Sequence, residues 1–167
     1  MSIAPTLQRY LAAKHVQFDS IPHEPTTSST RTAQVCRISG DCIAKAIVLR
    51  RDGAFLLAVL PASHHIRVAD LRKQLGDDVA LATEAEIEPL FPDCAHGAVP
   101  PFGDCYGLPV VVDESIEAQP EVYFEAGDHK TLLHVSHAQF AHLVSEARHG
   151  QFSDKVAKGT DATVIWA

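Results

Sequence analysis

Lys45 is the side chain whose type and setting most suggest chemistry, because it is a lone cation in an apolar segment. It lies inside CIAKAIVL, a run of small and branched apolar residues that predicts a strand. In a strand it would share one face with three branched aliphatic residues, Ile43, Ile47 and Leu49. A lysine in that position either extends its ammonium to solvent or lines a cleft. In a cleft, the ammonium would be held ready for a phosphate, a carbonyl or a carboxylate.

A stiff loop that contains glycine is the second candidate. The segment GAVPPFGD, residues 97–104, has two prolines that restrict its backbone and two glycines that allow a ligand to approach closely. Free N–H groups in such a loop can stabilise a carbonyl oxygen and the anion that it becomes. The same dipeptides are common in ordinary turns, so a purely structural role is the alternative.

Other reactive residue types form no recognisable constellation. The ten histidines include His64, His65, His129, His134 and His137, but none lies in an HExxH motif or a comparable spacing. No serine lies in a GxSxG motif, and the sequence shows no activating neighbour for Cys105. Nucleotide-binding motifs of the GxGxxG and P-loop kinds are absent as well. The sequence therefore predicts no metal, no cofactor and no protein nucleophile.

Strand and helix signals alternate around these candidates. Two apolar strands, residues 43–49 and 54–60, are joined across Asp52-Gly53, a favoured hairpin turn. Capping boxes at Thr83/Glu86 and Ser136/Gln139 predict a short helix and a helix that runs to about residue 148. The other predicted helices are residues 3–11, 31–38 (ended by Gly40) and 69–75 (ended by Gly76), and the other predicted strands are residues 16–21, 79–81, 108–112, 121–125, 130–135 and 162–166. Antiparallel hairpins with scattered helices predict an α+β fold.

Length and composition indicate an ordinary soluble protein. The 167 residues are enough for one domain, residues 1–167, with a substantial core. The N-terminus lacks the pattern of a signal peptide, and the longest apolar stretches are too short to span a bilayer. The four cysteines have no CxxC spacing and are expected to be reduced. We therefore expect a cytoplasmic protein with no membrane contact.

Charge is distributed unevenly along the chain. The net charge is −7, yet residues 31–73 hold eight Lys and Arg against three Asp, a local balance of +5. Residues 74–128 hold thirteen acids and no Lys or Arg. A basic third beside an acidic third suits a protein that contacts phosphate on one face only, and a merely solvated surface is the alternative.

Five segments occur in the order GDCIAKAIVLRRDG, LPASHHIRVADLRKQLG, LATEAEIEPLFPDCAHGAVPPFG, YGLPVVVD and VYFEAGDHKTLLHVS. Together they resemble the YbaK family of aminoacyl-tRNA deacylases. The resemblance covers residues 18–144 and extends to the related editing domain of bacterial prolyl-tRNA synthetases. It implies a compact α+β domain with a curved, mostly antiparallel mixed sheet and surrounding helices.

The resemblance also implies roles for particular residues. Lys45 would be the family's essential lysine, and a pocket would lie between its strand and residues 100–103. Gly103, with Pro101 and Phe102, would be the backbone that holds the ester carbonyl. The residues expected to border or close the pocket are Thr26, Thr27, Ser28, Asp128 and His129. Ala46 follows the lysine where alanine-specific members have asparagine, which argues against alanine as the substrate.

The implied activity is trans-editing, the hydrolysis of the ester of a mischarged tRNA. The partners would be the acceptor end of an aminoacyl-tRNA and an aminoacyl-tRNA synthetase. Lys45 would favour the tetrahedral anion, while water, a ribose hydroxyl or a substrate side chain attacks. A non-catalytic module that binds an amino acid or the acceptor end is the alternative.

Overall fold

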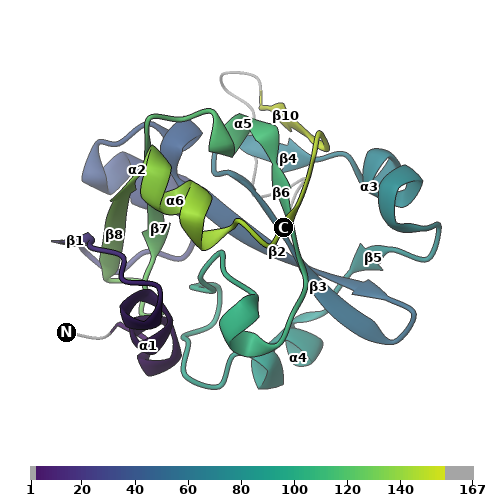
Figure 1. Cartoon of the computed structure of the whole chain (residues 1–167), viewed down its shortest axis with the longest axis horizontal. Coiled ribbons are helices and arrows are strands. Elements are labelled where there is room, and N and C mark those ends of the chain that lie inside the picture. Colours follow the sequence, from purple (N-terminus) through teal and green to yellow (C-terminus); the bar gives the residue numbers. More distant parts are fainter. Residues whose placement is uncertain (1–2, 157–167) are drawn as a thin grey trace.

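The computed structural model describes residues 3–156, which form a mixed α+β fold. Most helices are short, and the strands belong to three sheets (Figure 1). Among the described residues, no helix is long and apolar enough to cross a membrane. In chain order the elements are α1 (Pro5–Ala13), β1 (Asp19–Pro22), α2 (Ser29–Cys36), the 3-10 turn η1 (Gly40–Cys42), β2 (Ala44–Arg51), β3 (Ala54–Pro61), β4 (His64–Ile66), α3 (Val68–Leu75), β5 (Ala80–Leu81), α4 (Glu84–Ile87), η2 (Glu88–Leu90), η3 (Asp104–Tyr106), β6 (Val110–Asp113), α5 (Glu114–Glu117), β7 (Glu121–Glu125), β8 (Thr131–Ser136), α6 (His137–Leu143), β9 (Arg148–Gly150) and β10 (Ser153–Lys155).

The largest sheet has the strand order β5-β2-β3-β6-β9. Its β5-β2-β3 part is antiparallel, whereas β6 runs parallel to β3 and β9 parallel to β6. A second, antiparallel sheet has the order β1-β8-β7, and β4 pairs with β10 in a third. An isolated bridge between Ile43 and Tyr123 places the start of β2 beside β7. The expected mostly antiparallel mixed arrangement is confirmed, although it is divided among three sheets.

The hairpin that carries Lys45 forms as its turn residues predict. β2 and β3 pair from Ala44 opposite Pro61 to Arg51 opposite Ala54. Asp52 and Gly53 both have positive φ, 52° and 76°, as a two-residue turn with the twist of the strands requires. Alternation along β2 also holds, because Ile47 and Leu49 belong to one apolar cluster while Val48 belongs to another.

Local capping signals explain where several helices begin. Both capping boxes are present, with Thr83 and Glu86 at α4 and Ser136 and Gln139 at α6. Gly76 follows α3 with a φ of 120°, so the predicted end of that helix is confirmed.

Two helix ends differ from the sequence-based expectation. α2 ends at Cys36, and Arg37, not Gly40, is the left-handed residue that follows the helix. Gly40 instead begins η1, where a Cβ would lie 3.2 Å from the Ser63 amide nitrogen. α6 ends at Leu143, because the chain turns there and residues 148–150 join β6 as a strand. The strand expected at residues 162–166 lies outside the described residues.

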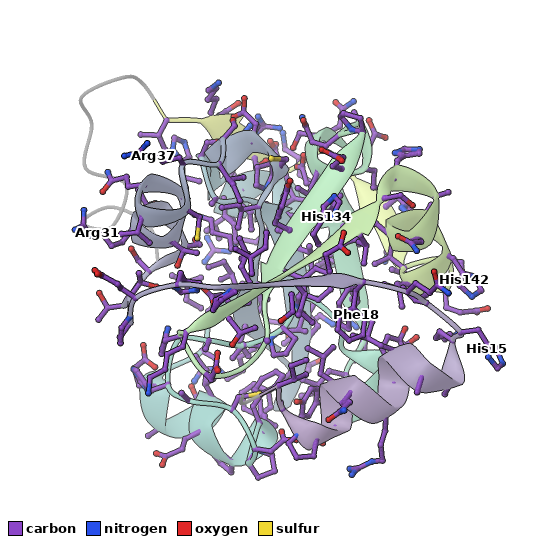
Figure 2. The ribbon with its side chains drawn as sticks, turned by 90° about the vertical axis from the view of Figure 1, so that its left-hand side faces the viewer. His15, Phe18, Arg31, Arg37, His134 and His142 are labelled. Atoms are coloured by element: carbon purple, nitrogen blue, oxygen red, sulfur yellow. The ribbon has the colours of Figure 1, made fainter. Side chains whose placement is uncertain are left out.

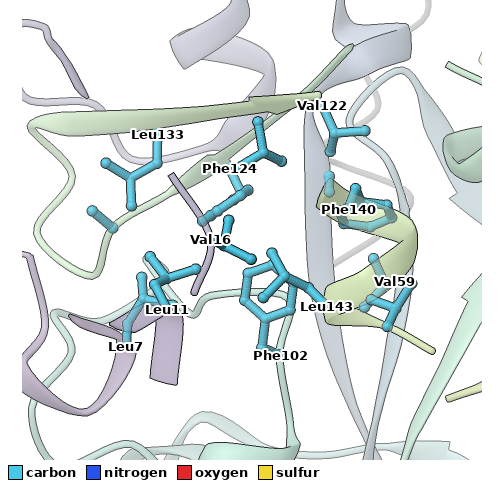
Figure 3. Packing of buried hydrophobic residues seen from close by; sticks show 14 of the residues in the cluster. Leu7, Leu11, Val16, Val59, Phe102, Val122, Phe124, Leu133, Phe140 and Leu143 are labelled. Atoms are coloured by element: carbon cyan, nitrogen blue, oxygen red, sulfur yellow. The ribbon is translucent and has the colours of Figure 1, made fainter. Parts of the chain in front are cut away.

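The main core lies between α1, α6 and the β1-β8-β7 sheet. Its cluster includes Leu7 and Leu11 of α1, Phe140 of α6 and Phe124 of β7 (Figure 3). Phe102 inserts between these elements and meets Phe124 edge to face, with ring centroids 4.9 Å apart. The loop that contains residues 97–104 is therefore anchored by an aromatic side chain in the core.

Asp113 joins the end of β6 to the C-terminal segment. The residue is 3% exposed. Its carboxylate accepts a hydrogen bond from the backbone N–H of Ser115 and so caps α5. It also accepts one from the backbone N–H of Phe152 at 2.8 Å.

We expect Asp113→Ala to lower the free energy of unfolding by about 2–3 kcal/mol, because it leaves a buried N–H unpaired and removes a helix cap. Chemical denaturation measures this, with the exposed Glu146→Ala as the control. A loss no larger than that of the control would contradict the structural role of Asp113.

Candidate active site

A pocket of about 310 Å³ lies along the outer edge of β2. β5 pairs only with Leu49 and Arg50, so the preceding residues of β2 are free to form one wall. The other walls come from residues 27–30 at the start of α2, residues 81–87 around α4, residues 96–99, Glu125 at the end of β7 and His129 after it. Most of the lining from β2 and α4 is small or apolar. The polar groups come from residues 27–30, Lys45, Glu84, His96, Glu125 and His129. A cavity of this size and composition suits a small ligand.

Lys45 lines this pocket, and burial lowers its pKa to about 8. Burial disfavours the charged ammonium, and no carboxylate in the described part of the chain forms an ion pair with it. Lys45 is half-buried and does not extend freely into solvent. A partly desolvated, unpaired cation at a pocket is available to interact with a ligand.

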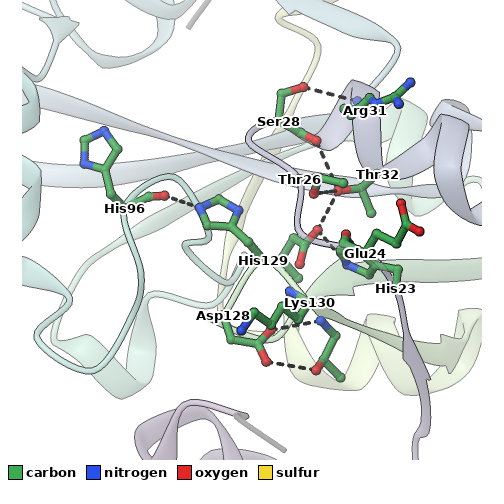
Figure 4. A network of polar contacts seen from close by, with 12 residues as sticks. His23, Glu24, Thr26, Ser28, Arg31, Thr32, His96, Asp128, His129 and Lys130 are labelled. Atoms are coloured by element: carbon green, nitrogen blue, oxygen red, sulfur yellow. Dashed lines mark hydrogen bonds and ion pairs between the residues drawn. The ribbon is translucent and has the colours of Figure 1, made fainter.

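Glu125, at the end of β7, also lines the pocket and is only 8% exposed. Its Oε1 accepts a hydrogen bond from the Thr32 hydroxyl at 2.7 Å, and His23 Nε2 lies 3.4 Å away. The Thr26 hydroxyl lies 2.6 Å from that of Thr32 (Figure 4). Because Thr32 has a single hydroxyl hydrogen, Thr26 donates to Thr32 when Thr32 donates to Glu125. Burial raises the pKa of Glu125, although these neighbours partly oppose the increase.

Backbone contacts hold three segments together around the pocket. The Thr26 N–H donates to the His129 carbonyl at 3.2 Å, and the Ala95 N–H donates to the Gly127 carbonyl at 2.7 Å. His129 Nε2 contacts the His96 carbonyl, as Figure 4 shows. Gly97 has a φ of 79°, and a Cβ there would lie 3.3 Å from the His129 ring. The loop, the turn after β7 and the approach to α2 are thus mutually positioned.

The structure brings four of the expected site residues to the pocket: Lys45, Thr27, Ser28 and His129. Thr26 lies behind them, 5% exposed, in the hydroxyl chain that leads to Glu125. Asp128 does not line the pocket. Its carboxylate caps the turn between β7 and β8 and accepts hydrogen bonds from Lys130 and Thr131.

Pro101, Phe102 and Gly103 lie away from this pocket. Phe102 is 2% exposed in the core, and the three residues border a separate cavity of about 10 Å³, room for about one water molecule. The part of the loop that reaches the pocket comes earlier, at His96, Gly97 and Val99. A pocket thus exists beside the Lys45 strand, but His96, Gly97 and Val99 line it, and the expected residues 100–103 do not.

The described residues offer no evident nucleophile or metal site at the pocket. Neither His96 nor His129 is hydrogen-bonded to one of the hydroxyls of residues 27–30. Burial raises the pKa of Cys94 to about 11 and that of Cys105 to about 12, so both thiols stay protonated at neutral pH. No group of three or more His, Cys, Asp or Glu side chains among residues 3–156 could hold a metal ion.

Sequence reasoning missed Glu125 and its partner Thr32. Alternation along EVYFE places Glu125 on the same face as Glu121, which is exposed. Glu125 is buried only because Thr32 of α2 and the His23 side chain cover that end of the strand. A contact between residues 93 positions apart leaves no signal in a single sequence.

The fold and the pocket together define an α+β protein with a small ligand pocket that carries one half-buried cation and one buried carboxylate. The model of the aminoacyl-tRNA editing domain family matches residues 23–143, most of the chain. The chain therefore belongs to the aminoacyl-tRNA editing domain family. Among curated proteins, none matches it.

Solved structures share the fold at low sequence identity. A proposed trans-editing enzyme for prolyl-tRNA synthetase is 22% identical with a TM-score of 0.77, over 92% of this chain and 98% of that chain. A hypothetical protein is 20% identical with a TM-score of 0.78, over 89% of this chain and 99% of that one. A proposed signal transduction protein from Marinobacter aquaeolei VT8 is 17% identical with a TM-score of 0.75, over 95% of this chain but 33% of that chain. At these identities the likeness shows the fold.

The pKa of Lys45 can be measured directly. We expect the Lys45 side chain to titrate near pH 8, because burial disfavours its charged form. The folded pKa lies below the unfolded value, so the charged lysine costs stability at neutral pH, and that cost disappears as pH rises through about 8 toward the unfolded pKa. NMR titration of lysine side chains, with the signal assigned by its loss in Lys45→Met, tests this. A midpoint above pH 10 would show that Lys45 is solvated.

Substitution of Gly103 tests whether this residue is needed for packing or for contact with a ligand. A Cβ at this position would lie 2.3 Å from the Leu108 carbonyl oxygen and 2.7 Å from Val110 Cγ2. We expect Gly103→Ala to lower the free energy of unfolding by about 1–3 kcal/mol, since the backbone around η3 must shift. Thermal and denaturant unfolding measure the loss. A variant as stable as the wild type but inactive would instead assign Gly103 a direct contact with substrate.

Proposed function

We propose that this protein is a trans-editing deacylase, which hydrolyses the ester between a noncognate amino acid and the terminal ribose of a tRNA. The observation that carries the proposal is the unpaired, partly desolvated Lys45 at a pocket of about 310 Å³. The family to which the chain belongs supports it, because its members are described as aminoacyl-tRNA editing domains.

In this proposal the pocket stabilises the transition state and water attacks the ester. The Lys45 ammonium favours the negative charge that develops on the carbonyl oxygen, or it holds the adjoining ribose and phosphate. The Gly97 and Val99 amides lie at the pocket, and no other described residue accepts a hydrogen bond from them. They are therefore candidate donors to the same oxygen. Ester hydrolysis is intrinsically easy, so a few kcal/mol of electrostatic stabilisation would suffice.

The acceptor end would enter beside α2. Arg31 and Arg37 are exposed at the two ends of this helix, on one side of the molecule (Figure 2), and neither forms an ion pair with a described carboxylate. Several other cations of the basic segment are already engaged: Arg50 pairs with Glu86, and Arg67 with Asp70 and Asp154. We propose that Arg31 and Arg37 contact phosphates close to the pocket, and that the partner protein is an aminoacyl-tRNA synthetase. The likeness to a proposed trans-editing enzyme for prolyl-tRNA synthetase supports this choice of partner.

A non-catalytic module that binds an amino acid or the acceptor end is the second candidate. The lack of an evident nucleophile among the described pocket residues favours it as much as it favours attack by water. Only the enzyme must show turnover, so single-turnover assays on a panel of mischarged tRNAs separate the two candidates.

We expect Lys45→Ala to reduce the deacylation rate by about 10²-fold or more, because it removes a preorganised charge worth about 3 kcal/mol to the developing anion. Lys45→Arg should not restore the full rate, because a planar guanidinium cannot occupy the place of a compact ammonium. Lys45→Ala should stay folded, since burial already disfavours the charged lysine.

The matched control is Lys73→Ala, which removes a lysine whose side chain is 80% exposed on α3. Melting curves of all three variants monitor folding. Equal rates for the wild type and the two Lys45 variants would contradict the proposed role of Lys45.

A further inference from the structure

Glu125 has a carboxylate oxygen that nothing in the described protein satisfies. Its Oε1 faces Thr32 and His23, whereas its Oε2 is buried and has no hydrogen-bond partner among the described residues. The residue is 8% exposed and lines the pocket. An unsatisfied carboxylate oxygen at this depth is costly, so a hydrogen-bond donor that reaches it from the pocket would be bound favourably.

The carboxylate of Glu125 itself favours a cationic donor. Its contacts among the described residues are the Thr32 hydroxyl and His23, and neither is a permanent cation. Hydrogen bonds between an ionised donor and a carboxylate are about twice as strong as neutral ones. A ligand ammonium at Oε2 would therefore complete the set of contacts better than a hydroxyl would.

The pocket holds a second charge, of opposite sign, on a different strand. Lys45 on β2 and Glu125 on β7 both line it, yet no ion pair joins them. A ligand that matches this pair has a cationic group and, some atoms away, an oxygen that carries or develops negative charge. An aminoacyl ester has both, in its α-ammonium and its carbonyl, whereas an uncharged ribose or a phosphate alone has no cation.

We propose that Glu125 binds the α-ammonium of the aminoacyl group, so that the pocket selects esters of amino acids whose α-amine is free. This assignment rests on the proposed function and names the substrate class of the same pocket. Peptidyl and N-acylated esters lack the ammonium and would be poor ligands. In this assignment Glu125 binds and orients the aminoacyl group, while Lys45 interacts with the reacting carbonyl.

The test uses two conjugates of 3′-amino-3′-deoxyadenosine that cannot be hydrolysed as esters. One carries L-alanine, whose small side chain also fits a pocket that selects a larger amino acid. The other carries propionate, which lacks only the α-amine and cannot clash where alanine fits. Calorimetry of the 167-residue chain measures the dissociation constant of each. We expect the wild type to bind the alanyl conjugate at least about 10-fold more tightly, the range of one charge-assisted hydrogen bond.

In Glu125→Gln, which keeps the shape of the side chain, the two conjugates should bind within about twofold of each other. Glu121→Gln is the matched control, because it removes an exposed carboxylate from the same strand, outside the pocket, and should retain the wild-type preference. Melting curves check that both variants are folded. A preference that survives in Glu125→Gln would overturn the assignment.

The comparison within the wild type needs no variant. Equal binding of the two conjugates, or no binding of the alanyl conjugate, overturns the assignment even if Glu125→Gln fails to fold. If mischarged tRNA is hydrolysed nevertheless, the proposed function stands without Glu125 as the ammonium site. A clear preference in a protein that hydrolyses no mischarged tRNA would support the ammonium site and refute the hydrolase.

Discussion

The hydrogen-bond chain from Thr26 through Thr32 to Glu125 is the interaction on which the pocket depends. It joins the segment before α2, α2 itself and the end of β7, and all three residues are at least 92% buried. If α2 moved away from the sheet, a carboxylate in an apolar environment would lose its main donor, which is unfavourable. These hydrogen bonds therefore hold residues 27–30 in place as one wall of the pocket. Ser28 caps α2, so the helix begins at that wall.

The chemistry of the pocket follows from charges that the protein itself leaves unpaired. Lys45 is partly desolvated without a carboxylate partner, and Glu125 retains an oxygen without a donor. Such groups cost stability in the free protein, and a ligand of complementary charge recovers that free energy on binding. For an ester, stabilisation of this kind can replace a covalent mechanism. This agrees with the lack of an evident nucleophile among the pocket residues that the structure describes.

Local signals predicted much of the fold and the position of Lys45, but not the far side of the pocket. The Asp52-Gly53 turn, both capping boxes and the alternation along β2 act over a few residues, and each is confirmed. The end of α6 could not be predicted, because pairing of residues 148–150 with β6 determines it. The burial of Glu125 could not be predicted for the same reason, because it depends on contacts with α2 and His23. Residues 101–103 were expected to hold the ligand, but the buried Phe102 side chain anchors them in the core.

The central claim is that the aminoacyl end of a tRNA occupies the pocket between Lys45 and Glu125. A crystal structure of the protein with the alanyl conjugate of 3′-amino-3′-deoxyadenosine tests it most directly. The account predicts an α-ammonium within hydrogen-bond distance of Glu125 Oε2, and a carbonyl oxygen that faces Lys45 and the Gly97 segment. A conjugate bound against residues 101–103, with Lys45 and Glu125 both uncovered, would contradict it.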